Sequence, residues 1–527
     1  MLKFVLDRQA ECGSSSDWRW DGRAWRKGDS WIVPLRHPAL THRMVTCEET
    51  VSVVSRERRR GDPAVEPGAP EQISYAELIR LAQETARWPI DYTMLRIDAG
   101  TVAVEAGVWA IAPIYLAGGR DRLAGSWQPT DLHDYADTST LSDTEVARLL
   151  TRRHRYGHET VWRAVKRLTE RSTATWQDGT LRLTYPSPAE HAMPRPLRRG
   201  ADVLTAFEHA LDTAVHRREF PAHQCGIELS GGLDSTNVAA TLAERGGQMI
   251  TAAAVLMDGS CGQAQRNRRR QLIEEFHCAG DITVDATEHL PFHPGGVRGR
   301  GLPVSPYSEP WIEAKQPMLA GLAACGVRWS FGGTGGDELM SVRACEKTGS
   351  HGSRPYPPWL GKRAVAAAPH SEEGIAPATV LRESTLLAFG SRTPQFLDKG
   401  LWPVSPLADP QLTRFCEWLP LPWRADKTLA RLRLSGLGLP LSVYCGPRDD
   451  PRETLDIAFR RHVLPFLETM CVEGGVLVDS GYVDADGLRR TARAVRRMGE
   501  KVALDRTLFT IAAVEAGLRT CSAHAVG

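Results

Sequence analysis

Residues 225–235 read Cys225-Gly226-Ile227-Glu228-Leu229-Ser230-Gly231-Gly232-Leu233-Asp234-Ser235. The apolar part predicts a short buried strand, and a helix is expected to begin near Ser235. Two glycines directly after a strand let the backbone turn sharply and approach a ligand without an intervening Cβ atom. The N–H groups and dipole of the following helix favour phosphate, and Ser230 and Ser235 add hydroxyl donors. We therefore predict a phosphate-binding loop made by Ser230, Gly231, Gly232, Asp234 and Ser235.

An aspartate takes the place that a lysine holds in many phosphate loops. The stretch lacks the lysine of G-x-x-x-x-G-K-[ST], so it is not a Walker A motif. A bare carboxylate beside a polyphosphate requires a divalent cation between them, which makes Asp234 a predicted ligand of Mg²⁺. The structural alternative is an ordinary turn between a strand and a helix.

A second glycine loop follows another apolar segment, Val327 to Phe331, and reads Gly332-Gly333-Thr334-Gly335-Gly336-Asp337-Glu338-Leu339. In a parallel sheet the carboxyl ends of the strands lie at one edge, where ligands bind at a switch point of the strand order. Asp234 and Asp337 are therefore predicted to converge on one Mg²⁺ held by the pyrophosphate. The alternative for Asp337 is N-capping of a helix, which is compatible with metal binding.

The pattern of apolar residues in the surrounding sequence differs between its two parts. Residues 1–190 contain short alternating segments such as Thr101 to Glu105 and Leu181 to Tyr185, which predict a β-rich antiparallel domain. The proline- and arginine-rich stretch Pro186 to Arg199 is interpreted as a linker. Residues 200–527 alternate strands with helices and become almost wholly helical after Asp409, which predicts a parallel sheet covered by helices.

Composition excludes several classes of protein. The chain has 527 residues, 42% hydrophobic and 24% charged, with a formal net charge of +2. Such a balance argues against binding to nucleic acid or anionic membranes, and no apolar run reaches the roughly 18 residues of a membrane span. The 11 cysteines form no C-x-x-C pair. Scattered cysteines suit reduced thiols, so we expect a cytoplasmic protein.

The two glycine loops together resemble the asparagine synthetase superfamily. That resemblance implies an N-terminal amidohydrolase-like sandwich, here a vestigial glutaminase, and a C-terminal N-type ATP pyrophosphatase domain. It implies ATP and Mg²⁺ as cofactors and a reaction in which a carboxylate is adenylated before an amine attacks it. By similarity Leu229, Ser230, Met257 and Gly333 frame the nucleotide. Lys427 is a catalytic candidate in the helical region that follows a P-x-x-D motif, Pro406 to Asp409.

Three positions depart from the small-substrate members of that superfamily. Glutamine-dependent relatives begin with Met-Cys, whereas position two is Leu2, which has no nucleophile. Thr334 stands where relatives carry glutamate or tyrosine, and threonine is not a useful base near neutral pH. The expected active-site lysine is replaced by Arg448, which can offset charge on a leaving pyrophosphate but is a poor proton donor.

These departures favour the lasso peptide cyclases, which the chain also resembles in the short strings Ala112 to Leu116, Gly125 to Trp127 and Leu401 to Pro406. The resemblance implies that an Asp or Glu side chain of a leader-free core peptide is joined to the N-terminal amine of the same peptide. It implies a precursor peptide as substrate, with a leader peptidase and a leader-binding protein as partners. The alternatives are a small-molecule amide or β-lactam synthetase and a catalytically dead peptide-binding scaffold.

The base that deprotonates the amine has three candidates. Glu383 is the first, because related synthetases place a glutamate some distance after the acidic loop, although a solvent-facing helix carboxylate is an equal alternative. His351 lies in a Gly/Ser-rich segment, and Glu309 precedes Trp311. The basic run Arg266 to Arg270 is interpreted as a solvated helix face. Three tryptophans, Trp311, Trp359 and Trp402, are interpreted as core residues rather than as a peptide groove.

Overall fold

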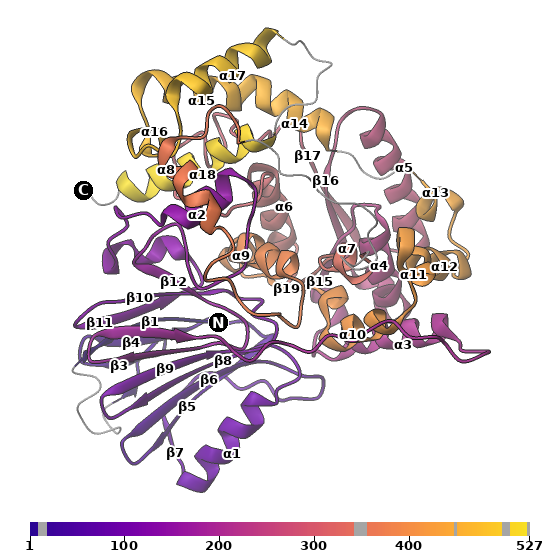
Figure 1. Cartoon of the computed structure of the whole chain (residues 1–527). Helices are drawn as coiled ribbons and strands as arrows, with labels where there is room; N and C mark the ends of the chain where they lie inside the picture. The colour runs from indigo at the N-terminus through magenta and orange to yellow at the C-terminus, as the bar shows by residue number, and fades with distance from the viewer. Residues whose placement is uncertain (9–17, 342–355, 447–450, 498–505, 524–527) are drawn as a thin grey trace.

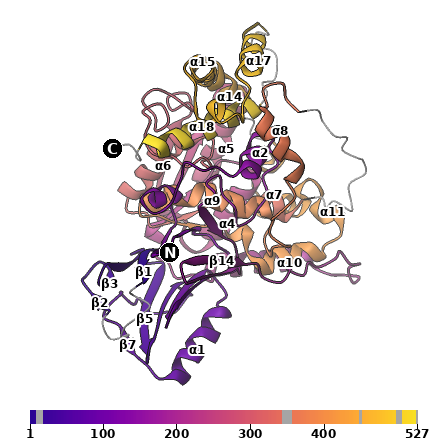
Figure 2. The same cartoon turned by 60° about the vertical axis from the view of Figure 1, so that its left-hand side comes forward.

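The computed structural model describes residues 1–8, 18–341, 356–446, 451–497 and 506–523. Figures 1 and 2 show an N-terminal sandwich of two sheets at the bottom of the molecule. A five-stranded parallel sheet with its helices lies above and beside the sandwich, and the last helices form the top. The architecture is therefore a mixture of an antiparallel β-rich part and an α/β part, as the sequence predicts.

Each sheet of the sandwich has seven strands. All pairings between their named strands are antiparallel except that of β5 with β7. The first sheet has the order β12 (Val165–Leu168), β10 (Ile114–Gly118), β11 (Arg122–Ser126), β1 (Leu2–Asp7), β4 (Ser30–Pro34), β3 (Trp25–Lys27) and β2 (Arg19–Trp20). The second has the order β14 (Thr180–Thr184), β13 (Thr173–Gln177), β9 (Thr101–Ala106), β8 (Tyr92–Asp98), β6 (Thr50–Glu57), β5 (Leu40–Cys47) and β7 (Glu71–Gln72).

Strand β1 shows how the sandwich forms its core. Leu2, Phe4 and Leu6 alternate along the strand and join one apolar cluster with residues of both sheets. A period of two places such residues on one face of a sheet, so the alternation in the sequence is the cause of the layer. Leu2 is only 1% exposed. The residue at the second position is thus a packing residue of the sandwich.

The parallel sheet has the order β17 (Gly280–Asp285), β16 (Thr251–Leu256), β15 (Cys225–Glu228), β18 (Trp329–Phe331) and β19 (Trp402–Val404). The chain adds strands on one side of β15 and then returns to add β18 and β19 on its other side. The sequence predicts the three inner strands but not the two edge strands. Strand β17 is half exposed, and the short strand β19 contains Pro403, which cannot donate to a sheet.

Helices cover both faces of this sheet, because neighbouring residues of β16 enter different cores. Ala252 packs with residues of α3 and α4, while Ala253 packs with residues of α6. The helices that precede the end of the sheet are α1 (Tyr75–Ala86), α2 (Asp143–Leu150), α3 (Val203–His216), α4 (Leu233–Gly246), α5 (Gly259–Glu275), α6 (Ile312–Ala324), α7 (Gly336–Leu339), α8 (Lys362–Ala367) and α9 (Glu383–Asp398).

Beyond β19 the described residues form helices and no further named strand, which agrees with the helical pattern expected after Asp409. These helices are α10 (Pro410–Trp418), α11 (Leu421–Arg424), α12 (Thr428–Gly436), α13 (Leu441–Tyr444), α14 (Arg452–Ala458), α15 (Leu464–Glu473), α16 (Val476–Asp479), α17 (Ala485–Arg497) and α18 (Arg506–Ala523). None of the described helices is long and apolar enough to cross a membrane.

A buried ion pair joins the sandwich to the parallel sheet. The Nε atom of Arg218, just after α3, lies 2.5 Å from a carboxylate oxygen of Glu57 at the end of β6. The indole N–H of Trp402 in β19 donates to the same oxygen over 2.8 Å. Trp402 and Trp359 are both 0% exposed, which confirms their interpretation as core residues. These side-chain contacts hold the sandwich and the parallel sheet together directly, in addition to the chain segment between β14 and α3.

Candidate active site

The first glycine loop connects β15 to α4 as the sequence predicts. Gly231 has φ +84°, a conformation that favours glycine, so the turn requires this residue. The backbone N–H of Gly232 donates to Ser230 Oγ over 3.2 Å, and Ser235 Oγ donates to the Gly232 carbonyl over 3.2 Å. Two serines thus order the loop from within, and their hydroxyl oxygens stay next to each other at 3.2 Å.

The second glycine loop packs directly on the first. A Cβ atom at Gly333 would lie 2.8 Å from the backbone nitrogen of Ser235, and one at Gly336 would overlap the side chain of Asp234. Gly335 has φ +96°, again a conformation that favours glycine. The glycines of the second loop are therefore needed for contact between the loops, and any side chain at Gly333 or Gly336 would push the loops apart.

Both loops leave the carboxyl ends of neighbouring strands, because β15 pairs with β18 in parallel. The strand order also reverses between these two strands, since β16 and β17 lie on the far side of β15. A reversal of this kind opens a crevice at the sheet edge where ligands bind. The fold therefore produces the switch point that the sequence predicts.

Asp234 and Asp337 meet at the ammonium group of Lys427. The Nζ atom lies 2.5 Å from Asp234 Oδ2 and 2.6 Å from Asp337 Oδ1. Lys427 and the preceding Asp426 both have left-handed backbone conformations, with φ of 57° and 50°. Such residues are strained, and strain of this kind concentrates at functional sites. The structure thus brings together three of the residues selected from the sequence.

The charges of Asp234, Asp337 and Lys427 influence one another. Burial raises the pKa of Asp234 above its ordinary value even though Lys427 acts in the opposite direction. Burial alone would lower the pKa of Lys427, but the ion pairs with Asp234 and Asp337 outweigh burial and raise it. Lys427 therefore stays protonated as a fixed cation at neutral pH.

The two carboxylates fit a divalent cation. They already converge on one positive charge, and the side chain of Asp337 is 83% exposed. Among the described residues no group of three or more His, Cys, Asp or Glu side chains could hold a metal ion. A pair of carboxylates with phosphate oxygens and water completing the shell is the arrangement that Mg²⁺ uses with nucleotides. Asp234 and Asp337 would hold the ion, and ATP would supply the remaining ligands.

A cavity of about 590 Å³ opens at this edge of the sheet. Its size lies within the range of small-molecule sites. Eight predicted nucleotide or metal residues line it, together with Lys427. The eight are Ser230, Gly231, Gly232, Asp234, Ser235, Met257, Gly333 and Asp337. Leu229 is different: it is 0% exposed, is not among the lining residues and contributes through its backbone.

A second ion cluster lines the cavity around Glu228, the last residue of β15. Its two carboxylate oxygens each lie 2.9 Å from an Nη atom of Arg392 in α9, and one also pairs with Lys315 of α6. The other Nη atom of Arg392 donates to Thr334 Oγ1 over 2.7 Å. Burial would raise the pKa of Glu228, but Arg392 and Lys315 outweigh burial and lower it. Glu228 is therefore an ionised anchor and a poor base.

Two arginines of the basic run in α5 are buried, which corrects the interpretation of the whole run as a solvated face. Arg268 and Arg269 are 4% and 2% exposed. Arg268 Nε donates to the Gly231 carbonyl over 3.1 Å, and Arg269 donates to the Leu229 carbonyl and pairs with Asp281. Both arginines lie in the middle of α5, on the side of the helix that packs against the glycine loop.

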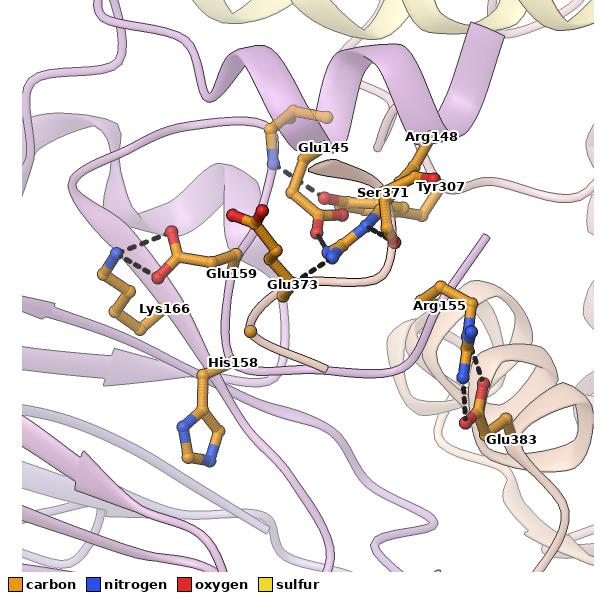
Figure 3. Close-up of polar contacts among 12 residues, drawn as sticks. Glu145, Arg148, Arg155, His158, Glu159, Lys166, Tyr307, Ser371, Glu373 and Glu383 are labelled. Atoms are coloured by element: carbon orange, nitrogen blue, oxygen red, sulfur yellow. Dashed lines mark hydrogen bonds and ion pairs between the residues drawn. The ribbon is translucent and has the colours of Figure 1, made fainter. Parts of the chain in front are cut away.

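Glu383, the first candidate for the base, is not among the residues that line the cavity. It begins α9, and its carboxylate faces Arg155 at 3.2 and 3.3 Å, as Figure 3 shows. Arg392 lies nine residues later on the same helix, which corresponds to about 13 Å along the axis. The carboxylate of Glu383 therefore belongs to a contact with the stretch that follows α2.

Glu309 lies closer to the lining residues. One of its oxygens is 3.6 Å from Arg392 Nε, and its other oxygen is buried without a hydrogen-bond partner among the described residues. Trp311, two residues later, lines the cavity and is half-buried, unlike the two core tryptophans. Arg448 and His351 lie outside the described residues.

Four site residues escaped the reading of the sequence, namely Glu228, Arg268, Lys315 and Arg392. One signal was available for Glu228, because a charged residue at the end of an otherwise apolar strand needs a partner. A second was the position of the arginine run after a strand of the parallel sheet. Nothing local marked Lys315 or Arg392, which are ordinary helix residues in the sequence.

The comparisons with known proteins agree with this geometry. Residues 206–404 match the family model of asparagine synthase. The matched segment contains all five strands of the parallel sheet and both glycine loops, so this part of the chain is similar to asparagine synthase. A comparison with curated proteins gave no match.

Proposed function

We propose that this chain is an ATP-dependent ligase that closes an isopeptide bond within a lasso precursor peptide. The asparagine synthase match supports ATP-dependent amide-bond formation in general. The observation that carries the proposal is the convergence of Asp234 and Asp337 beside two packed glycine loops in one cavity. That arrangement suits a nucleotide whose α-phosphorus is attacked by a carboxylate.

The reaction has two steps. An oxygen of the Asp or Glu side chain of the peptide attacks the α-phosphorus of ATP, which forms an acyl-adenylate and releases pyrophosphate. The N-terminal amine of the peptide then attacks the acyl carbon, a proton leaves the amine and AMP departs. When bound, Mg²⁺ would neutralise charge on the leaving pyrophosphate. Lys427 and the loop N–H groups would add fixed positive charge there.

Two features favour an amine that belongs to the substrate over ammonia from glutamine. Leu2 is a buried core residue of the sandwich and carries no nucleophilic group. Thr334, which replaces the glutamate or tyrosine of small-substrate relatives, accepts a hydrogen bond from Arg392 and serves no base function. The half-buried Trp311 on the cavity wall offers an apolar surface that suits a peptide.

For deprotonation of the amine we favour Glu309. Its unpartnered oxygen and its proximity to Arg392 support this assignment, whereas the carboxylate of Glu383 is engaged by Arg155. Arg448 keeps its proposed role of offsetting charge on pyrophosphate. A leader peptidase and a leader-binding protein are proposed partners that deliver the core peptide, and the proposed compartment is the cytoplasm.

One experiment tests the proposal. The purified chain is incubated with ATP, Mg²⁺ and a leader-free peptide that has an N-terminal Gly and one internal Asp or Glu. We expect a product lighter by one water, together with AMP and pyrophosphate. Pyrophosphate exchange with small carboxylates alone would instead identify a small-molecule synthetase. Peptide binding without any AMP would identify a scaffold.

Asp234→Ala provides the decisive variant. Loss of the Asp234 carboxylate from the predicted phosphate-binding loop is expected to lower AMP formation by about 10³-fold or more. Removal of other groups that stabilise transition-state charge lowers reaction rates by a comparable factor. Glu244→Ala is the matched control, because Glu244 lies on the same helix outside the cavity lining. Unchanged AMP formation in Asp234→Ala would refute the proposed role of Asp234 in the reaction.

A further inference from the structure

The buried arginines of α5 have no role in the reaction described so far. Arg268 and Arg269 are consecutive, yet neither points into solvent, and burying two guanidinium groups is costly unless they are paired and hydrogen-bonded. Arg266, two residues earlier, pairs with Asp285 over 2.9 Å, and Arg270 is exposed. The run therefore contains members with different surroundings, and only two of them contact the glycine loop.

Arg269 supports the loop from behind. Its guanidinium donates to the Leu229 carbonyl and pairs with Asp281 on β17, which matches its charge. It is not among the residues that line the cavity. Its contacts connect the start of the loop to β17, so Arg269 acts as a structural support of the loop.

Arg268 differs because it also lines the cavity. Its Nε–H group donates to the Gly231 carbonyl, at the residue whose left-handed conformation makes the turn. Helix α5 approaches so closely that a Cβ atom at Gly231 would lie 3.4 Å from Cβ of Arg268. The same guanidinium thus fixes the loop backbone and presents positive charge to the space beside it.

That space is bordered by the serines of the first loop and by Arg431 and Lys427 of the helical part. Asp234 lies on the same loop and Asp337 on the loop packed against it, so the proposed metal site and a cation border one cavity. A polyphosphate requires this combination, because a single divalent ion leaves part of its charge unmatched. Arginine suits phosphate oxygens, since its donors form a planar fork.

We propose that Arg268 is a polyphosphate-binding residue that contacts the β- and γ-phosphates of ATP, and pyrophosphate once it has formed. This inference rests on the proposed use of ATP but not on the peptide. Arg268 stabilises the loop through Nε, and the same residue lines the cavity beside that loop. The ligand recognised by Arg268 is an inorganic or nucleoside polyphosphate, whatever its nucleobase.

The test measures binding without turnover. Calorimetry compares wild-type protein with Arg268→Met for four probes in the presence of Mg²⁺, namely adenosine, AMP, ATP and inorganic pyrophosphate. We expect ATP and pyrophosphate to bind about 10- to 100-fold more weakly to the variant, because hydrogen bonds to charged groups are lost. Adenosine and AMP should bind within about twofold of wild type, since they lack the β- and γ-phosphates.

Arg270→Met is the control, because Arg270 is an exposed arginine of the same helix. Unchanged ATP affinity in Arg268→Met, or an equal loss for all four probes, would overturn the proposal. If Arg268→Met does not fold, Arg268→Lys keeps the charge without the fork and should show a smaller loss with the same dependence on phosphate number. If polyphosphate binding depends on Arg268 but no cyclised peptide forms, the proposed function is refuted and the proposed role of Arg268 stands.

Discussion

Two buried clusters of ions use the same chemistry at different places of the parallel sheet. At the joint with the sandwich, the side chains of Glu57 and Arg218 are each 1% exposed. In the cavity, the side chains of Glu228 and Arg392 are 13% and 23% exposed. The first cluster is sealed by its neighbours and can act only on stability. The second opens to a space large enough for a ligand, so its ordered charges are available to the reaction.

The sealed cluster gives the largest expected effect on stability. Arg218→Met leaves the carboxylate of Glu57 buried without its cation, which costs about 3–5 kcal/mol of unfolding free energy. Urea unfolding of the variant and the wild type measures this loss. ATP affinity of the folded variant should be unchanged, because neither Glu57 nor Arg218 lines the cavity.

A double variant, Glu57→Gln with Arg218→Met, serves as the control for the sealed cluster. It removes both charges, and a neutral pair in a core costs far less than one unmatched charge. Most of the lost stability should therefore return. Equal stability of the wild type and Arg218→Met would show that the joint does not depend on this ion pair.

The cavity cluster should respond in activity through Glu309, one of whose carboxylate oxygens has no hydrogen-bond partner among the described residues. Glu309→Gln is expected to lower AMP formation from the peptide by about 100-fold, the contribution of a general base, with little change in thermal unfolding. Glu383→Gln should change the rate by less than about twofold, because its carboxylate is engaged by Arg155. Rates of AMP release by both variants decide between the two glutamates. The reverse order would restore Glu383 as the base.

A smaller effect is expected from Arg392→Lys. Lysine keeps the positive charge beside Glu228 but cannot donate to Glu228 and Thr334 with one planar group, so turnover should fall about tenfold. The denaturant midpoint should move much less than in Arg218→Met. Lys399→Met, at the end of the same helix, is the matched control. If Arg392→Lys lowers stability but not turnover, the cavity cluster serves only stability, like the pair of Glu57 and Arg218.

Much of the site follows from local rules that operate over a few residues. The strand before Ser230, the left-handed Gly231 and the helix after it are each specified by neighbouring residues, and Gly335 plays the same part in the second loop. The three inner strands were predicted because they are apolar. The edge strands β17 and β19 were not, because half exposure and Pro403 weaken the pattern that marks a strand.

Positions of charged helix residues could not be predicted in the same way. Arg268 and Arg269 read as solvent-facing because a run of arginines usually is, and only the packing of α5 against the glycine loop buries them. Glu383 and Arg392 share one helix, yet they face different parts of the molecule. A sequence gives the spacing of residues along a helix but not the element against which each turn packs.

The sequence alone determined a phosphate loop, a second acidic loop and their place at the edge of a parallel sheet. Glycine conformations and strand–helix alternation are local, so one segment is enough to specify them. The tertiary structure decided that Lys427 joins the two aspartates, that Glu228 holds Arg392 across 164 positions of the chain, and that Arg268 lines the cavity. Such contacts depend on how whole helices pack, and packing is a property of the assembled core.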